Sequence, residues 1–131
     1  MSGETIHILG IPGSLRAGSY NLGLLRAALE LLPEGARLEI VGLADIPPYN
    51  ADVQNQGDPE PVAQLKRRVE VADVVLIATP EYNYSIPGVL KNAIDWVSRP
   101  PKTSPLRKKP IGLMGASVGE SGTMRGQLAV R

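Results

Sequence analysis

Residues 74–96 have the sequence VVLIATPEYNYSIPGVLKNAIDW, and this stretch decides the fold. It begins with five apolar residues, 74–78, whose β-branched content and lack of alternation predict a strand buried on both faces. A polar, aromatic segment follows at 80–87. The residues from Gly88 onward have apolar side chains at helical spacing, namely Val89, Ala93 and Trp96. A buried parallel strand that leads into a polar loop and then a helix is where open α/β sheets place their ligands.

Strand and helix patterns alternate along the rest of the chain as well. Apolar runs predict further strands at 5–11, 37–41 and 111–116, and amphipathic runs predict helices at 22–32, 61–71 and 123–130. The first of these helices has a leucine stripe that is expected to be buried, formed by Leu22, Leu25, Leu29 and Leu32. This alternation predicts an α/β domain with a doubly wound parallel sheet, three α/β/α layers and right-handed crossovers.

Two segments depart from that regular pattern. Residues 37–41 alternate between polar and apolar side chains, which predicts a half-exposed strand near an edge of the sheet. Residues 44–59 are rich in Pro, Asn, Asp and Gly and are expected to form the longest irregular stretch. A long loop in a compact domain is often functional.

A sheet of this type is expected to continue beyond residue 131. The last helix is only begun, and the fourth strand would be left as an exposed parallel edge, which favours aggregation. A further strand and helix are therefore expected, on the order of 30 residues or more. The chain is interpreted as a single domain, 1–131, that lacks its last strand and helix. The alternative is a short form that a partner subunit completes.

The composition narrows the possible functions. The chain has no cysteine, so thiol chemistry, disulfides and thiolate metal sites are excluded. Its single histidine, His7, argues against a histidine metal cluster or a catalytic triad and is interpreted as structural. The formal net charge of +1 argues against nucleic-acid binding, and the basic triplet 66–68 is interpreted as a solvated helix face. The sequence has neither a signal-peptide pattern nor a membrane-length apolar run, so a cytoplasmic location is expected.

The loop after the first strand has the composition of a phosphate-binding turn. Gly13 and Gly18 allow the backbone to approach a ligand closely, and Arg16 offers a charged donor. The N-terminus of the following helix adds free N–H groups and the positive end of a dipole. Shorter polar donors are Ser14, Ser19 and Asn21. The alternative interpretation is an ordinary turn before a helix that Ser19 or Asn21 caps.

Other phosphate-binding motifs fit this sequence less well. The glycines at 10, 13 and 18 do not form the G-x-G-x-x-G pattern of dinucleotide-binding folds, and no G-K-[ST] of a P-loop is present. A receiver-type phosphorylation module shares the expected topology, but it needs an aspartate after the third strand. Here that strand ends in Ala78-Thr79-Pro80.

The loops after the third and fourth strands are expected at the same edge of the sheet as the first loop. Residues 81–85 could hold a flat heterocycle through the backbone and Asn83, with a tyrosine against its face or rim, although local packing also explains the tyrosines. The small residues at 117–122 could admit the other side of a ring. A phosphate anchor, a ring slot and a small-residue wall together predict a flavin mononucleotide (FMN) site between the first and third strands.

The motifs of these loops resemble those of the NAD(P)H-dependent FMN reductase family. The resemblance lies in Gly13-Ser14-Leu15-Arg16 with Ser19 and Asn21, and in Pro80-Glu81-Tyr82-Asn83 followed by Pro87-Gly88 and the segment 90–96. It covers essentially the whole chain. That family includes soluble quinone, chromate and azo-dye reductases, and the resemblance implies a flavodoxin-like fold.

The resemblance also implies roles for particular residues. The phosphate would be held at Ser14, Arg16, Ser19, Tyr20 and Asn21. The ribityl chain and ring would be lined by Pro80, Glu81, Tyr82 and Asn83, and bordered by Ser117 and Gly119. Family members are commonly dimers or tetramers, which implies a homo-oligomer that packs through helix 87–98. No metal site, nucleic-acid partner or membrane span is expected, and the other expected partner is a small-molecule electron acceptor.

The expected reaction is a hydride transfer from NADPH or NADH to N5 of FMN, followed by two-electron reduction of a quinone, free flavin, azo compound or metal oxyanion. The flavin carries this chemistry, so no catalytic side chain is expected. Lys91 and Asp95 are interpreted as a helix pair or subunit contact. Two alternatives stay open: a non-enzymatic flavodoxin-type electron carrier, and a flavin-binding regulator without turnover.

Overall fold

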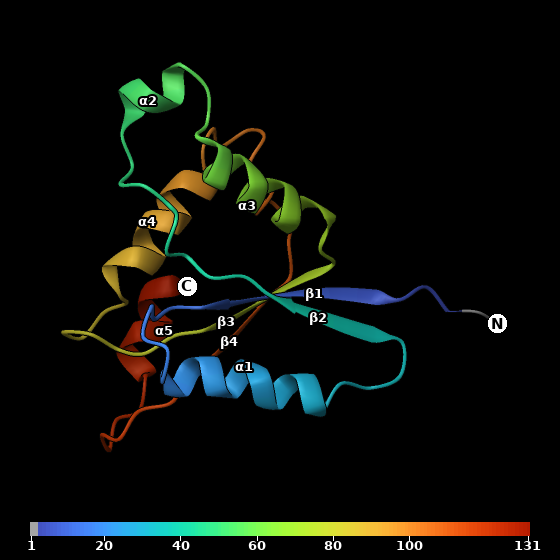
Figure 1. Cartoon of the computed structure of the whole chain (residues 1–131). Coiled ribbons are helices and arrows are strands. Elements are labelled where there is room, and N and C mark those ends of the chain that lie inside the picture. The colour runs from blue at the N-terminus through green and yellow to red at the C-terminus, as the bar shows by residue number, and fades with distance from the viewer. Residues whose placement is uncertain (1–2) are drawn as a thin grey trace.

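Four parallel strands form the sheet of this protein. The structure is a computed structural model and describes residues 3–131. The strands are β1 (Ile6–Pro12), β2 (Ala36–Ile40), β3 (Val74–Ala78) and β4 (Ile111–Met114), in the spatial order β2-β1-β3-β4 (Figure 1). After β1, the chain places β2 on one side of that strand and later places β3 and β4 on its other side. The topological switch point therefore lies between β1 and β3, as predicted.

Helices cover both faces of the sheet. They are α1 (Tyr20–Glu30), α2 (Ala51–Asn55), α3 (Glu60–Val71), α4 (Gly88–Val97) and α5 (Met124–Val130). Figure 1 shows α1 on one face of the sheet and α3 and α4 on the other, which confirms the predicted α/β/α layers. The expected strands and most of the expected helices lie within about two residues of their predicted bounds. The short helix α2 was not predicted.

The main hydrophobic core lies between the sheet and the pair α3 and α4. Leu9 of β1 and Val75 of β3 are almost fully buried, and alternate residues of both strands point the same way. The helices contribute Leu65, Val69, Leu90, Ala93 and Val97. Val130 of α5 also packs against this core. The run 74–78 is thus a central strand between two neighbours, as its unbroken apolar pattern indicated.

The buried stripe of α1 differs from the prediction. Leu25 is fully buried, but Leu29 is 42% exposed. The side that faces inward starts at Asn21, which is 3% exposed, and passes through Leu25. The polar Asn21 takes an inward position because the backbone of the loop after β4 accepts and donates hydrogen bonds there. Position 29 lies outside this buried side.

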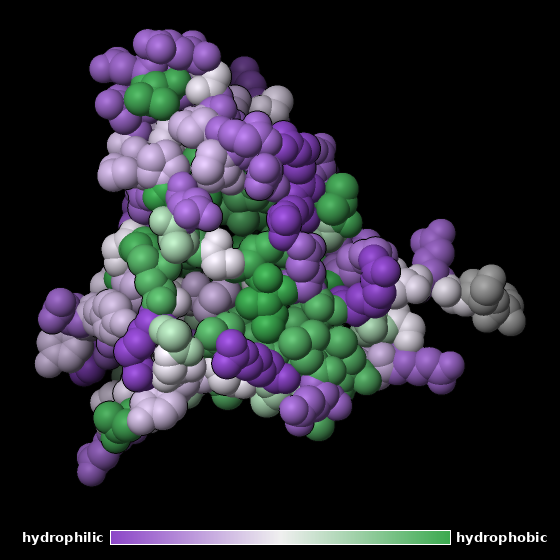
Figure 2. Space-filling model, in the orientation of Figure 1, coloured by the Kyte–Doolittle hydropathy of each residue, from purple (hydrophilic) through white to green (hydrophobic). Residues whose placement is uncertain are grey.

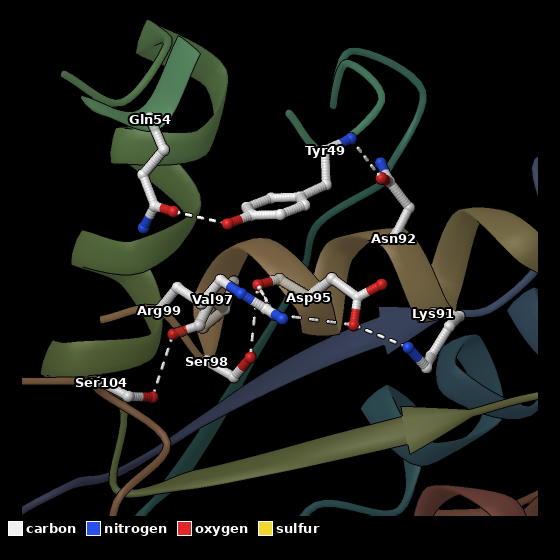
Figure 3. Close-up of polar contacts among 9 residues, drawn as sticks. All are labelled: Tyr49, Gln54, Lys91, Asn92, Asp95, Val97, Ser98, Arg99 and Ser104. Atoms are coloured by element: carbon white, nitrogen blue, oxygen red, sulfur yellow. Dashed lines mark hydrogen bonds and ion pairs between the residues drawn. The ribbon is translucent and has the colours of Figure 1, made fainter. Parts of the chain in front are cut away.

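The segment 44–59 folds over the outer side of α4 and is held there by hydrogen bonds. Asn92 of α4 accepts from the backbone N–H of Tyr49 (2.7 Å) and donates to the carbonyl of Pro47 (2.8 Å). The indole N–H of Trp96 donates to the same carbonyl (2.7 Å), and its ring meets Tyr49 edge to face. Figure 3 shows Tyr49 lying over α4 and bonded to Gln54. Within the expected irregular stretch, Pro47 and Tyr49 are thus docked on α4, whereas α2 has no buried residue.

β2 forms one edge of the sheet, as its alternating sequence predicted. Its burial alternates between half-buried and exposed residues. Figure 2 shows an apolar area over this edge, between α1 and α3. Within residues 3–131, no helix is long and apolar enough to cross a membrane.

Candidate functional site

The three loops that follow β1, β3 and β4 surround a cavity of about 270 Å³ at the carboxyl edge of the sheet. The predicted site residues that line it are Ser14, Arg16, Ser19, Tyr20, Asn21, Pro80, Glu81, Tyr82 and Ser117. Two further residues in its wall, Ala116 and Val118, were not predicted. Asn83 and Gly119, which were predicted, are not part of the lining. The sequence-based site is therefore brought together by the fold, with two members outside the cavity.

The loop after β1 is a tight turn that leads into α1. The hydroxyl of Ser14 accepts from the N–H of Arg16 (3.2 Å), and the N–H of Ser19 donates to the carbonyl of Arg16 (3.0 Å). Ser19 is the N-cap of α1, and its Oγ accepts from the N–H groups of Asn21 (3.2 Å) and Leu22 (3.4 Å). The capped-helix interpretation of this loop is therefore correct for Ser19, which still has its hydroxyl proton to donate.

This loop also offers donors to an anion. The guanidinium of Arg16 lies 5.5 Å from the ring centroid of Tyr20 and borders the cavity. Within residues 3–131, the backbone N–H groups of Ser14, Leu15 and Ala17 have no protein acceptor. The amino end of α1 directs its dipole toward the same place. A cation, two hydroxyls and free N–H groups form a donor set that suits a phosphate.

Asn21 joins the first loop to the loop after β4. Its Oδ1 accepts from the N–H of Ala116 (2.9 Å), and its Nδ2 donates to the carbonyl of Ala116 (3.3 Å). This side chain is buried and both of its polar atoms are engaged by protein. Its geometry thus fits a structural link between two walls of the cavity, while direct contact of Asn21 with a phosphate stays a prediction.

The loop after β3 contains a two-residue reverse turn. The N–H and carbonyl groups of Tyr82 and Ser85 pair in both directions (3.0 and 2.9 Å). Asn83 and Tyr84 between them have positive φ angles of 52° and 65°, as a type I′ turn requires. Asparagine tolerates this conformation, but a bulky tyrosine there is strained. Asn83 therefore shapes the turn, which explains why its side chain is exposed and lies outside the cavity lining.

Glu81 is tied to α5. One carboxylate oxygen accepts from the backbone N–H of Gly126 (2.9 Å), and the other lies 3.9 Å from a guanidinium nitrogen of Arg125. The Glu81 side chain is only 11% exposed. Arg125 in turn stacks on Tyr84, 4.3 Å from its ring centroid. The turn after β3 and the start of α5 thus form one packed unit.

Close backbone contacts bring the three loops together. A Cβ on Gly115 would lie 2.6 Å from the carbonyl of Thr79 and 2.1 Å from Oγ1 of Thr123. A Cβ on Gly13 would lie 2.9 Å from Oγ1 of Thr79. Glycine suits both positions because a Cβ there would overlap atoms of Thr79 or Thr123. Sequence reasoning missed Thr79 and Gly115, although a small residue directly after each strand was the available signal.

A larger cavity of about 920 Å³ lies away from this edge, between α2 and the end of α4. Its charged side chains are already paired, because Asp58 bonds Lys66 (2.6 Å) and Arg99 bonds the carbonyl of Asp95 (2.9 Å). The guanidinium of Arg99 also stacks on Tyr49. With its charges satisfied internally, this cavity lacks the converging free donors of the smaller one.

Known proteins resemble this chain over nearly its whole length. Residues 6–131 match the family described as NADPH-dependent FMN reductase. The chain belongs to this family. An NAD(P)H-dependent FMN reductase of Pseudomonas aeruginosa is 49% identical over 128 residues, which cover 98% of this chain and 69% of that protein. A quinone reductase of Escherichia coli K12 is 43% identical, with the same two shares covered.

Solved structures agree with that assignment. FerB of Paracoccus denitrificans, described as a flavoenzyme NAD(P)H:(acceptor) oxidoreductase, superimposes with a TM-score of 0.89 at 36% identity. The match covers 96% of this chain and 69% of FerB. As a member of the FMN reductase family, the chain is an oxidoreductase that depends on FMN and NAD(P)H, and its flavodoxin-like α/β fold is confirmed.

The cavity fits the cofactor of the FMN reductase family. The loop after β1 lines it with the donor set described above, and the loops after β3 and β4 line it with Pro80, Tyr82 and the apolar Val118. A phosphate suits the donors of the first loop, and a flat ring suits the apolar and aromatic side chains of the other two. At about 270 Å³ the cavity is slightly smaller than most small-molecule pockets, which span roughly 300–1,000 Å³, so part of the ligand would lie outside it.

The remaining predicted residues lie away from this site. His7 is on β1 toward its amino end, where its Nδ1 accepts from a guanidinium nitrogen of Arg37 (3.1 Å). Lys91 and Asp95 form an ion pair on α4 (2.7 Å), as their spacing suggested. Of residues 3–131, no three His, Cys, Asp or Glu side chains are grouped in a way that could hold a metal ion.

Proposed function

We propose that this chain binds FMN in the cavity between the three loops and uses it to transfer two electrons from NAD(P)H to a small acceptor. The observation that carries this proposal is the polarity of one cavity. The loop after β1 contributes the cation Arg16 to its lining, and the loop after β3 contributes Pro80 and Tyr82. When bound, FMN supplies the redox chemistry by accepting a hydride from the nicotinamide and passing two electrons to the acceptor.

Different residues of the chain would bind different parts of FMN. Arg16 and the hydroxyls of Ser14 and Ser19 would hold the phosphate, together with the free N–H groups of the first loop. Tyr82, which is 49% exposed, would border the ring at the mouth of the cavity. Ser117 would border the other side. One face would stay open to nicotinamide and acceptor in turn, which predicts ping-pong kinetics.

No side chain is assigned as a catalytic acid or base. The ionisable groups in the described lining of the cavity are Arg16, Tyr20, Glu81 and Tyr82. Glu81 is already engaged by the N–H of Gly126, and the flavin itself supplies the redox chemistry of the reaction. Quinones, free flavins, azo compounds and metal oxyanions all suit an open flavin face, so the acceptor is left as a class of small oxidants.

A homodimer or homotetramer that packs through helix 87–98, in a cytoplasmic location, stays a prediction. Trp96 is completely buried under segment 44–59 of its own chain. The exposed Lys91 and the half-buried Asp95 would therefore meet a partner, and Trp96 would not.

The visible absorption spectrum, recorded before and after anaerobic addition of NADPH, tests the proposed function. We expect a flavin spectrum that bleaches with NADPH and returns when a quinone is added. NADH serves as the second donor. Bound flavin that neither donor reduces would contradict the oxidoreductase reaction, and a chain that FMN cannot reconstitute would contradict the binding site.

A further inference from the structure

We propose that Glu81 is a positioning residue that fixes the distance between two walls of the cavity, and that its carboxylate does not contact the flavin. This inference rests on the proposed function, because the cavity is taken to be the flavin site. The wall after β3 carries Tyr82, and the wall after β4 leads into α5. Glu81 lies at the join between them.

The first observation is the hydrogen bond to Gly126. Gly126 is the third residue of α5, so its N–H has no acceptor within its own helix. Gly126 is buried, and Glu81 accepts this N–H at 2.9 Å. An unmet N–H in such a place is costly, which gives the bond a clear structural purpose.

The second observation is the close packing at the same point. A Cβ on Gly126 would lie 3.2 Å from the carbonyl oxygen of Ser85 and 3.5 Å from that of Pro80. The α5 backbone therefore packs directly on the segment between Pro80 and Ser85. Any residue with a side chain would widen the gap that Glu81 closes.

The third observation is that both carboxylate oxygens of Glu81 already have partners. Gly126 uses one, and Arg125 lies beside the other at 3.9 Å. The Arg125 guanidinium also stacks on the ring of Tyr84. The backbone of Tyr84 has a left-handed conformation. The carboxylate thus organises the turn and α5 together, and a rigid wall on each side is what a flat ring requires.

The test compares Glu81→Ala with Glu81→Gln. The amide of glutamine keeps an oxygen that can accept the Gly126 N–H, whereas alanine cannot. Hydrogen exchange at the Gly126 amide, measured by NMR without flavin, reports the bond itself. We expect at least about 10-fold faster exchange in Glu81→Ala and near wild-type exchange in Glu81→Gln. Arg125→Ala is the matched control, which removes the ion pair and leaves the Gly126 bond in place.

Calorimetric titration with FMN and with riboflavin then measures the effect on the site. Because a displaced wall affects the ring and not the phosphate, Glu81→Ala should weaken both ligands by a similar factor, about 10-fold. Glu81→Gln should bind both nearly as well as wild type. Unchanged Gly126 exchange in Glu81→Ala would overturn the proposal. So would a Glu81→Gln variant that protects Gly126 but loses flavin as severely as the alanine variant, since that would show direct contact.

Gly126→Ala gives a second route if Glu81→Ala does not fold. Its methyl group pushes against Ser85 and leaves Glu81 intact, so weaker riboflavin binding is expected, and unchanged binding would overturn the proposal. A wild-type chain that binds no flavin would contradict the proposed function and the flavin-related part of this inference. Gly126 exchange would still decide whether Glu81 makes the bond.

Discussion

At the scale of single residues, Arg16 decides whether the first loop holds a phosphate. It is the one cation in the described lining of the cavity. Replacing Arg16 with alanine removes a charge-assisted contact, for which a loss of about 1.5–3 kcal/mol is typical. We therefore expect FMN affinity to fall roughly 10- to 100-fold in a calorimetric titration.

Two controls make that measurement specific. Riboflavin has no phosphate, so its affinity should be the same for wild type and Arg16→Ala. Arg26→Ala removes an exposed arginine of α1 outside the cavity and should leave FMN binding unchanged. Equal losses of FMN and riboflavin in Arg16→Ala would mean that this arginine supports the loop and not the phosphate.

The glycines at the carboxyl edge are a second residue-level test. Gly115→Ala would place a methyl group 2.6 Å from the Thr79 carbonyl, and backbone must move to relieve the clash. We expect a loss of about 1–3 kcal/mol of unfolding free energy, measured by urea denaturation followed by circular dichroism. Gly23→Ala is the matched control, because it lies in α1 with nothing within 4 Å of the new methyl group. It should stabilise the protein by about 0.5–1 kcal/mol.

Part of the site could be predicted because the types of residue in its loops were enough to indicate what they could bind. A serine, an arginine and a helix start after a strand indicate an anion site, and the fold brought them to one cavity. The sequence could not indicate how the same atoms pair within the chain. Asn21 and Glu81 have the chemistry of ligand contacts, but the structure shows them bonded to Ala116 and Gly126, which lie at distant positions in the chain.

At the scale of elements, the turn 82–85 depends on the conformation of two residues. A non-glycine residue with left-handed φ costs about 1–2 kcal/mol, and asparagine is one of the residues that tolerate it. Asn83→Ala should therefore destabilise the protein by about 1 kcal/mol, whereas Asn83→Gly should be nearly neutral. Urea denaturation of the two variants checks this. An alanine variant as stable as the glycine variant would show that the positive φ at position 83 is not maintained.

The docking of segment 44–59 on α4 is a second element-level feature. Asn92 both accepts from and donates to this segment, so Asn92→Ala removes two hydrogen bonds at once. We expect the Tyr49 amide to exchange at least about 10-fold faster, while FMN affinity stays unchanged, since the segment lies outside the described cavity lining. An altered FMN affinity would indicate that the segment communicates with the site.

The elements themselves were predictable to different degrees. β3 was found at its observed bounds because a central strand is apolar on both faces and needs no context. Segment 44–59 was expected to be irregular. Its helix α2 was not predicted because it has five residues, which are too few to show a helical period. The inward position of Asn21 was missed for another reason: it depends on Ala116, a contact formed only in the folded chain.

At the scale of the whole molecule, ligand binding should raise thermal stability. Because FMN would bind the folded chain only, a concentration of 100 times its dissociation constant adds about 2.7 kcal/mol. For a domain of this size the melting temperature should rise by roughly 8–13 °C. Thermal scans with FMN check the increase, and Arg16→Ala at the same FMN concentration should lose most of it. No increase for wild type would contradict binding to the folded state.

The single tryptophan of this chain gives the folded protein an internal fluorophore. Trp96 is fully buried, donates its indole proton to Pro47 and packs against Tyr49, so its environment joins α4 to segment 44–59. Its emission should therefore shift to longer wavelength when that segment detaches, before the sheet unfolds. A flavin bound in the cavity at the carboxyl edge of the sheet would accept its excitation energy. Trp96 fluorescence would thus report detachment of segment 44–59, global unfolding and FMN binding in the unmodified protein.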